Sequence, residues 1–496
     1  MRTLVFAALS FSLALSVPAA SRAQDGAVPR GAPLTLDDAI TLARRNNPAF
    51  LAQANDRIAA DAAVRSARGA FLPSADASFG SRYQQGGQQV FNGLTFSNSS
   101  ATVQSSYNLS LNYRINSATF VTPKAAGANR AAVEADITGS AEQLRAAVTN
   151  QYLTVLQAQA RARLQDTLVT TAQGQLDLAK AKVAVGSGTA LDIRRAEVAL
   201  GQAQVALLTA RNNAEVEKLR LFQQMGVPQP AGVELITQFR VDPPTFALDS
   251  LLDLARRANP SIVALRSRER AAELNASVAR AAYTPTLSLS TGWGGNSYEY
   301  TSGDYLVNQA RNGISSSQAN CFTQDSIRVG AGLAGTDCTG PRYAFTEAQA
   351  QAIRDQNNQF PFRFNRSPFA LSAQLSIPVF DNFAREERVQ VAQANRENAM
   401  YSVKAKDLAL TADVTQAYLT VMTSVQTVAL QEQNATKAQE ELAFAEERYK
   451  VGASTFLDVT TSRGTYAQAL IDRVNSVYDY HKAVAALENA VGRPLR

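Results

Sequence analysis

The feature that most constrains the fold is an internal duplication. The stretch LARRNNP at Leu42–Pro48 returns as LARRANP at Leu254–Pro260, 212 residues later. Further along, YLTV at Tyr152–Val155 returns at Tyr418–Val421, 266 residues later. The difference between the two offsets gives the second copy 54 extra residues, all between Pro285 and Gln374. We therefore expect two similar units, with the extra residues in an exposed loop.

Within each unit the hydrophobic period changes at a proline. Helical spacing precedes Pro73 and Pro285, and alternation of apolar and polar residues follows, more weakly in the first strand of each unit than in the second. The alternation predicts strands at about 74–85, 101–115, 286–298 and 368–380. Such strands reach about the 10 residues that a tilted strand needs to cross a bilayer. One face is apolar and carries Tyr and Trp, and the other is polar, which is typical of a membrane β-barrel rather than of a soluble sandwich.

The remainder of each unit predicts long helices that reverse at a Val-Gly pair. In the first unit they cover about 124–185 and 189–224, and in the second about 384–450 and 455–490. Apolar residues recur at steps of three and four, as in a coiled coil; Val414, Tyr418, Val421, Val425 and Val428 show this spacing. We expect a first repeat at 24–228, a linker at 229–245 and a second repeat at 246–496. All of the predicted elements together describe a mixed fold, mostly α-helical, with a membrane β-barrel.

The N-terminal residues 1–23 have the pattern of a secretory signal peptide, with Arg2 followed by an apolar run. No later stretch of the sequence is apolar enough for a spanning helix. An exported chain of this kind is expected to stay soluble or to cross a membrane as strands. The two cysteines, Cys321 and Cys338, can then form a disulfide, with two free thiols as the alternative. The net charge of +6 has no long basic run, which argues against nucleic-acid binding.

Nothing in the sequence indicates catalysis, a cofactor or a metal. The single histidine, His481, lies in a helical pattern without a nucleophile motif, and we expect it to pack in the helix. GAGLAG at Gly330–Gly335 matches a dinucleotide-binding spacing but lies in the 54-residue insertion, outside any βαβ unit. We therefore expect it to be a flexible extracellular loop, within an insertion at about 301–366. The chain is predicted not to be an enzyme.

Four strands cannot close a barrel, because at least about eight are needed. An open sheet edge in lipid would leave backbone groups unpaired, at a cost of several kcal/mol each. Two chains would give a barrel filled by its own side chains, whereas three would give twelve strands and room for water. The polar inner faces favour the homotrimer.

Two tandem units of helix, hairpin, long helix, Val-Gly turn and helix resemble the TolC family of outer-membrane efflux ducts. The resemblance rests on LTLDDAITLARRNNP, LSIPVFD, YKVGASTFLDV and the terminal VGRP, and it covers nearly all of the chain after residue 23. It implies a trimeric 12-stranded barrel in the outer membrane of a Gram-negative bacterium, continued by a periplasmic helical barrel. It also implies a passive duct for tripartite efflux or type I secretion, partnered by a periplasmic adaptor and an inner-membrane pump of the RND or ABC type. A structural or adhesive envelope trimer is the alternative.

The resemblance also assigns roles to the repeated turns. Adaptor contacts would fall on the tips, Val185, Gly186, Val451 and Gly452. Carboxylates just beyond the tips would line the periplasmic entrance, at Asp192 and Asp458. Thr461 stands where relatives carry a further carboxylate. Thr189 and Thr455 each precede their aspartate by three residues, so a helix-capping role for both aspartates remains open.

Overall fold

A computed structural model describes residues 33–92, 94–98, 100–230, 232–237, 239–241 and 246–495. The predicted signal peptide lies outside these residues. The chain divides into two compact structural units, each of which contains residues of both sequence repeats. Unit 1 comprises residues up to 61, 128–270 and 397–496, and unit 2 comprises 62–127 and 271–396. Among the described helices, none is both long and apolar enough to span a membrane.

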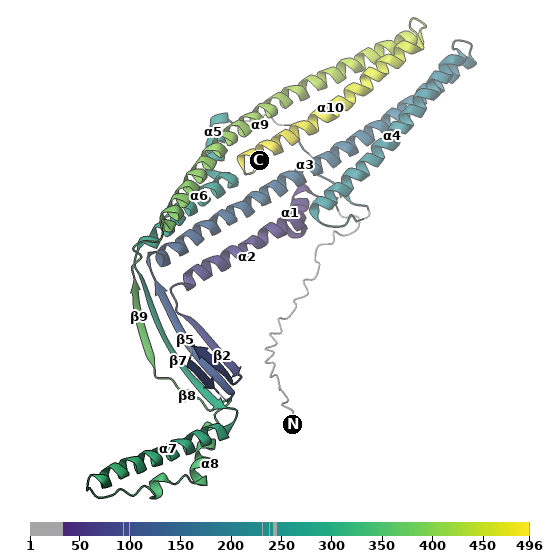
Figure 1. Cartoon of the computed structure of the whole chain (residues 1–496). Coiled ribbons are helices and arrows are strands. Elements are labelled where there is room, and N and C mark those ends of the chain that lie inside the picture. The colour runs from purple at the N-terminus through teal and green to yellow at the C-terminus, as the bar shows by residue number, and fades with distance from the viewer. Residues whose placement is uncertain are drawn as a thin grey trace. The chain divides into compact units, whose positions relative to one another are not determined.

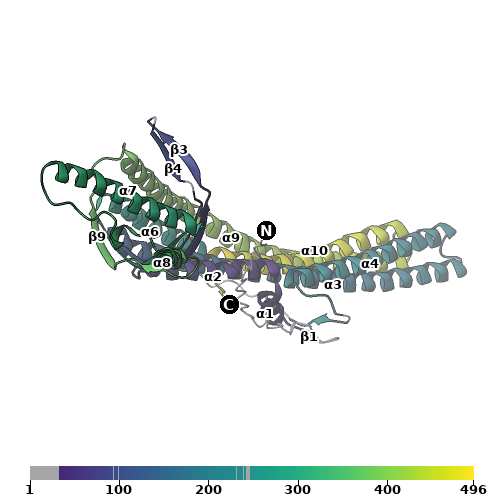
Figure 2. The same ribbon diagram turned by 60° about the horizontal axis from the view of Figure 1, so that its bottom comes forward.

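Unit 1 is built around two helical hairpins, which Figures 1 and 2 show side by side. The first joins α3 (Ser117–Ala184) to α4 (Ala190–Met225), and the second joins α9 (Ala384–Lys450) to α10 (Phe456–Val491). The short helices α1 (Leu36–Asn46) and α5 (Leu248–Ala258) pack against the base of the first and second hairpin, respectively. Strands β1 (Pro33–Leu34) and β6 (Glu234–Leu235) pair in parallel.

The duplication appears directly in the two cores of unit 1. Matching positions of the two repeats are fully buried in separate hydrophobic clusters. The matched pairs are Ala43 and Ala255, Val148 and Val414, and Leu221 and Leu487. Helices α2 (Pro48–Gly69) and α6 (Pro260–Arg280) begin at matching prolines. The residue before each proline, Asn47 or Asn259, is extended, as a following proline requires.

Unit 2 contains an antiparallel sheet in the order β2-β5-β7-β9. Its strands are β2 (Ser74–Gln84), β5 (Thr102–Ile115), β7 (Thr286–Tyr300) and β9 (Ala370–Ser376), and β8 (Asn365–Arg366) adds a short pairing to β7. The β5–β7 pairing joins the two repeats. The outermost strands β2 and β9 each pair with one strand only among the described residues.

The register places the apolar residues of all four strands on one face. Leu109 lies opposite both Ala77 and Trp293, and Leu287 opposite both Ile115 and Leu375. We call this the apolar face. The other, polar face carries Ser, Asn and Gln, for example in the row Asn112, Ser290 and Ser372. Residues of the apolar face such as Phe79, Trp293 and Leu371 are exposed in the single chain, so this face needs a covering that one chain does not supply.

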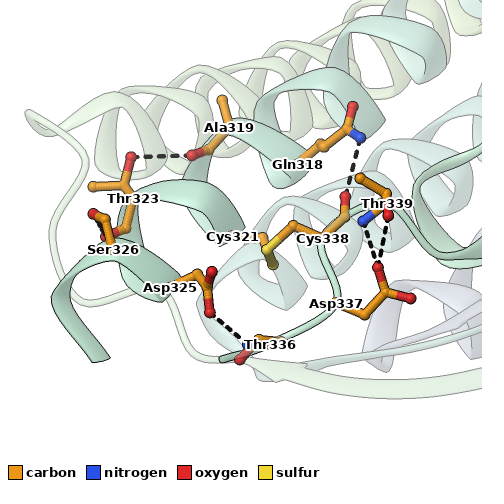
Figure 3. Close-up of a disulfide and its surroundings, with 10 residues drawn as sticks. All are labelled: Gln318, Ala319, Cys321, Thr323, Asp325, Ser326, Thr336, Asp337, Cys338 and Thr339. Atoms are coloured by element: carbon orange, nitrogen blue, oxygen red, sulfur yellow. Dashed lines mark hydrogen bonds between the residues drawn. A yellow bond between two sulfur atoms is a disulfide. The ribbon is translucent and has the colours of Figure 1, made fainter. Parts of the chain in front are cut away.

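The insertion is more ordered than its composition predicts. The sequence predicts an exposed loop here, but the insertion contains α7 (Gly303–Gly330), the 3-10 helix Pro341–Tyr343 and α8 (Glu347–Asn357). Cys321 of α7 forms a disulfide with Cys338 (Figure 3). Val307 and Cys321 are buried fourteen residues apart, about four helical turns, so they share one face. The GAGLAG stretch begins at Gly330, the last residue of α7, and follows no strand.

Smaller differences from the prediction have local causes. Helix α3 begins at Ser117 rather than near 124, with Pro123 inside it, and the Thr122 hydroxyl donates to the carbonyl of Ala118 there. Strand β9 ends at Ser376 rather than near 380, since Pro378 has no N–H to give to the ladder. Residues between the first two predicted strands form an extra hairpin, β3 (Gly87–Phe91) with β4 (Leu94–Asn98). The 3-10 helix Ala281–Tyr283 follows α6.

Candidate functional site at the two hairpin tips

The two Val-Gly turns share one backbone geometry. Gly186 and Gly452 have positive φ angles of 76° and 77°. In the first turn the N–H of Ser187 donates to the carbonyl of Lys182 at 2.9 Å, and the second turn has the matching bond at 2.8 Å. A left-handed glycine with this bond is a Schellman motif, which ends a helix and reverses the chain. The repeated sequence therefore encodes the same tip twice.

Each tip presents the same pair of apolar side chains. Val185 and Val451 are both 78% exposed. Leu191 and Leu457, which the sequence analysis did not select, are exposed at matching positions beyond each turn. The sequence could have indicated them, because a leucine directly precedes the aspartate in both copies of the turn. Two matched apolar pairs on exposed turns are suited to contact another protein.

Asp192 and Asp458 each close a capping box. The carboxylate of Asp192 accepts from the backbone N–H and the hydroxyl of Thr189 at 3.0 and 2.7 Å. The carboxylate of Asp458 accepts from the same groups of Thr455 at 2.8 and 2.9 Å. Capping is thus a role that both aspartates have. In both carboxylates Oδ2 accepts these bonds.

The two aspartates differ in surroundings. Asp458 is exposed, and hydrogen bonds from Thr455 hold the pKa of its carboxyl below the usual range, so it is charged at neutral pH. Thr461, one turn further along α10, is exposed on the same side of the helix. Asp192 is half-buried and lies near Tyr449, whose pKa is raised by burial and then by this carboxylate.

Polar contacts tie the two hairpins together near their tips. The Lys182 ammonium donates to the carbonyl of Tyr449 at 2.7 Å and lies 3.6 Å from the centre of its ring. Sequence reasoning missed this contact because the equivalent of Lys182, Arg448, bonds to the carbonyl of Ala453 in its own turn instead. The duplicated chain is therefore not symmetric at its tips.

The same asymmetry extends along α10. The Arg463 guanidinium, half-buried, forms an ion pair with Glu446 at 2.5 Å. Burial lowers the pKa of Arg463, and Glu446 opposes that effect. A third contact, from the Gln175 amide to Glu446, spans 3.4 Å and reaches from α3 to α9. The ion pair therefore joins the two helices of the second hairpin, and the Gln175 contact joins the first hairpin to the second.

His481 is fully buried in unit 1, with the rings of Phe239 and Tyr480 about it at 5.1 and 5.0 Å between centroids. Within the described part of the chain, no group of three His, Cys, Asp or Glu residues is placed to hold a metal ion.

Comparison with known proteins gives the family. A family profile described as outer membrane efflux protein matches residues 39–227 and 344–493, more than half of the chain. The pyoverdine export outer membrane protein OpmQ of Pseudomonas putida is 25% identical over 350 residues, which are 70% of this chain and 61% of OpmQ. The chain thus spans less than two thirds of OpmQ. TolC of Salmonella enteritidis is 24% identical over 444 residues, 88% of this chain and 78% of TolC.

A solved structure shows the same fold. The outer membrane protein VceC of Vibrio cholerae superposes with a TM-score of 0.67 and 15% identity, covering 93% of this chain and 97% of VceC. The stretch of the chain between the two segments that the family profile matches, residues 228–343, contains most of the insertion. The chain belongs to the outer membrane efflux protein family, and it is an outer-membrane protein.

Proposed function

We propose that three copies of the chain form a passive export duct, whose sheets complete a 12-stranded barrel in the outer membrane and whose helices continue it in the periplasm. An inner-membrane pump drives the substrate through a periplasmic adaptor, and the duct itself needs no catalytic group, metal or cofactor. The observation that carries the proposal is the four-stranded sheet with one exposed apolar face, one polar face and two edge strands that, among the described residues, pair on one side only.

The sheet argues for assembly with other copies. The apolar face suits lipid and the polar face suits water. The free backbone groups of β2 and β9 would be costly in lipid, at several kcal/mol each. Pairing β2 of one copy with β9 of the next satisfies both edges. Three copies make twelve strands, the number that leaves a lumen for water.

The helices support the same assembly. Exposed leucine and valine residues recur every seven positions on α4, at Leu191, Val198 and Val205. On α9 exposed leucines recur every eleven positions, at Leu408, Leu419 and Leu430. Such regular stripes are seams for packing against further helices. Leu408 and Leu419 also line a groove of about 1050 Å³ between α9 and α10. This groove could receive the exposed side chains of a helix from another copy.

The hairpin tips are the proposed adaptor contacts. Val185 and Val451, with Gly186 and Gly452 to set their turns, present the same surface twice per chain. Three chains would present six such surfaces, which suits an adaptor assembly of matching symmetry. OpmQ is named for pyoverdine export, which supports small-molecule efflux as the route for this chain. Type I protein secretion is the second route that the same duct would serve.

Conductance of the purified protein tests the proposal. Reconstituted into a planar bilayer, it should give discrete ohmic steps. The variant Lys182→Met is measured as well, because it removes the contact to Tyr449. If that contact holds the entrance closed in the wild type, the variant should conduct. Absence of steps from both proteins, when each is inserted in the bilayer, would contradict a duct.

The aspartates provide a prediction about ion selectivity. In the trimer Asp192 and Asp458 supply six carboxylates near the entrance, which attract cations. The double variant Asp192→Asn, Asp458→Asn keeps an oxygen for the capping bonds from Thr189 and Thr455. Its cation preference in a planar bilayer should fall, and block by divalent cations should weaken. Wild-type selectivity in an assembled double variant would leave the aspartates as helix caps only.

The insertion provides a prediction about assembly. Removing Asn308–Arg342 deletes most of α7 and the disulfide. It leaves the Asn357 side chain, which accepts from the backbone N–H of Tyr300 at 2.9 Å and donates to the Tyr300 carbonyl at 2.8 Å. Because those bonds hold the end of β7, trimer assembly and export should stay within about two-fold of wild type. A trimer band on a non-boiled gel is the measurement, and its loss would place the insertion in the assembly core.

A further inference from the structure

The chain returns from the insertion to β9 through a segment that lies on the apolar face of the sheet. We call this segment, Gln359–Phe369, the strap. Its first two backbone N–H groups donate to the carboxylate of Glu299 at 3.1 and 2.9 Å. Further on, the N–H of Ser367 donates to the carbonyl of Gly294 at 2.9 Å. The strap is therefore fixed to β7 at both ends.

Beneath the strap the apolar face becomes polar. The hydroxyls of Ser105 and Ser297 lie 2.7 Å apart and are buried, and Ser105 also donates to the carbonyl of Pro361. The strap supplies aromatic cover next to them. Phe364 packs on Tyr107 with ring centroids 4.8 Å apart. The strap thus covers a polar row that interrupts the apolar face.

The exposed side of the strap combines aromatic and basic groups. Phe362 is 73% exposed, and Arg363 and Arg366 are exposed beside it. Arg366 pairs with Gly295, so it projects on the apolar face. The segment 359–369 contains no acidic residue, and the one carboxylate on this face of the four strands, Glu299, accepts the strap's own N–H groups. The charge at this edge of the apolar face is therefore positive.

This combination matches one chemistry. Exposed phenylalanine suits the level where acyl chains meet headgroups, and arginine binds phosphate through two parallel hydrogen bonds. We infer that the strap is a binding site for a phosphorylated lipid of the outer leaflet, with its phosphates on Arg363 and Arg366 and its acyl chains on the apolar face. The inference rests on the proposed placement of this face against lipid.

The test compares lipid binding by the full-length protein in nanodiscs. The probe is bisphosphorylated lipid A in a zwitterionic lipid background, with dephosphorylated lipid A as the second arm. Native mass spectrometry counts the copies retained by each assembly. The double variant Arg363→Gln, Arg366→Gln should retain the phosphorylated form about ten-fold more weakly. The control Arg82→Gln, Arg114→Gln removes two exposed arginines from the polar face of the same sheet and should bind as wild type.

Each outcome decides a different point. Equal retention of lipid A by the strap variant and by wild type would overturn the site. Equal retention of the phosphorylated and the dephosphorylated lipid by wild type would overturn it too. The protein lacking Asn308–Arg342 keeps the strap and should keep the preference, so its loss would move the site into α7. If the wild-type protein failed to insert in the nanodisc, the proposed function would be contradicted as well. If it inserted but showed no preference for phosphorylated lipid, only the strap site would be overturned.

Discussion

Leu371→Arg is expected to stop the protein from assembling in the membrane. Leu371 lies opposite Thr291, in the middle of the apolar face, and is 69% exposed in the single chain. Facing lipid at that depth, an arginine costs about 2–4 kcal/mol in each copy of the chain. Three copies in one assembly multiply that cost. The trimer recovered from outer-membrane fractions should fall at least about ten-fold.

The matched control is Gln374→Arg, on the polar face of the same strand β9. There the arginine would meet water, so assembly should be close to wild type. Normal recovery of Leu371→Arg from the outer membrane would show that the apolar face does not face lipid. Loss of both variants would show only that β9 tolerates no arginine, and Leu109→Arg with Asn108→Arg on β5 would then repeat the comparison.

Gly452→Val is expected to abolish export while leaving the assembled protein intact. Gly452 has φ of 77°, and a Cβ built there has nothing within 4 Å. The cost is therefore conformational rather than steric, about 1–2 kcal/mol at the turn and more for a β-branched residue. A turn that cannot hold this geometry loses the Schellman bond and displaces Val451. Gly186→Val should act alike in the other tip.

The matched control is Gly464→Val, where a Cβ also meets nothing within 4 Å but the backbone is helical. It adds the same side chain without a conformational penalty, because valine has a somewhat higher helix propensity than glycine. Accumulation of ethidium in cells that lack the chromosomal gene measures export. Wild-type ethidium efflux by Gly452→Val, with the trimer present, would show that the turn geometry is not needed for docking.

The repeats explain what could be predicted from the sequence. Because both copies contain the Val-Gly turn and the Thr-x-x-Asp spacing, the tips and both capping boxes followed from local rules. The apolar and polar faces of the strands followed from the alternation of residues, and the pairing in the structure keeps the apolar residues on one face. These features depend on residues close together in the chain, which is why a single sequence was enough.

Other features depend on differences between the copies or on distant residues. The contact of Lys182 with Tyr449 joins positions 267 residues apart, and its counterpart Arg448 behaves differently. Helix α7 was missed because its Gly, Ser and Asn content favoured a loop, whereas burial of Val307 and Cys321 stabilises the helix. The strap carries no repeat signal, since the first repeat has no such segment. The proposed pairing of β2 with β9 would need a second copy, so neither one sequence nor one chain could display it.

The central claim is that three chains complete one duct, and native mass spectrometry of the protein purified from outer membranes tests it most directly. The account predicts a single assembly with three times the mass of the mature chain, because four strands from each copy make twelve. A mass of one or two chains, from protein that still conducts ions in a bilayer, would contradict it.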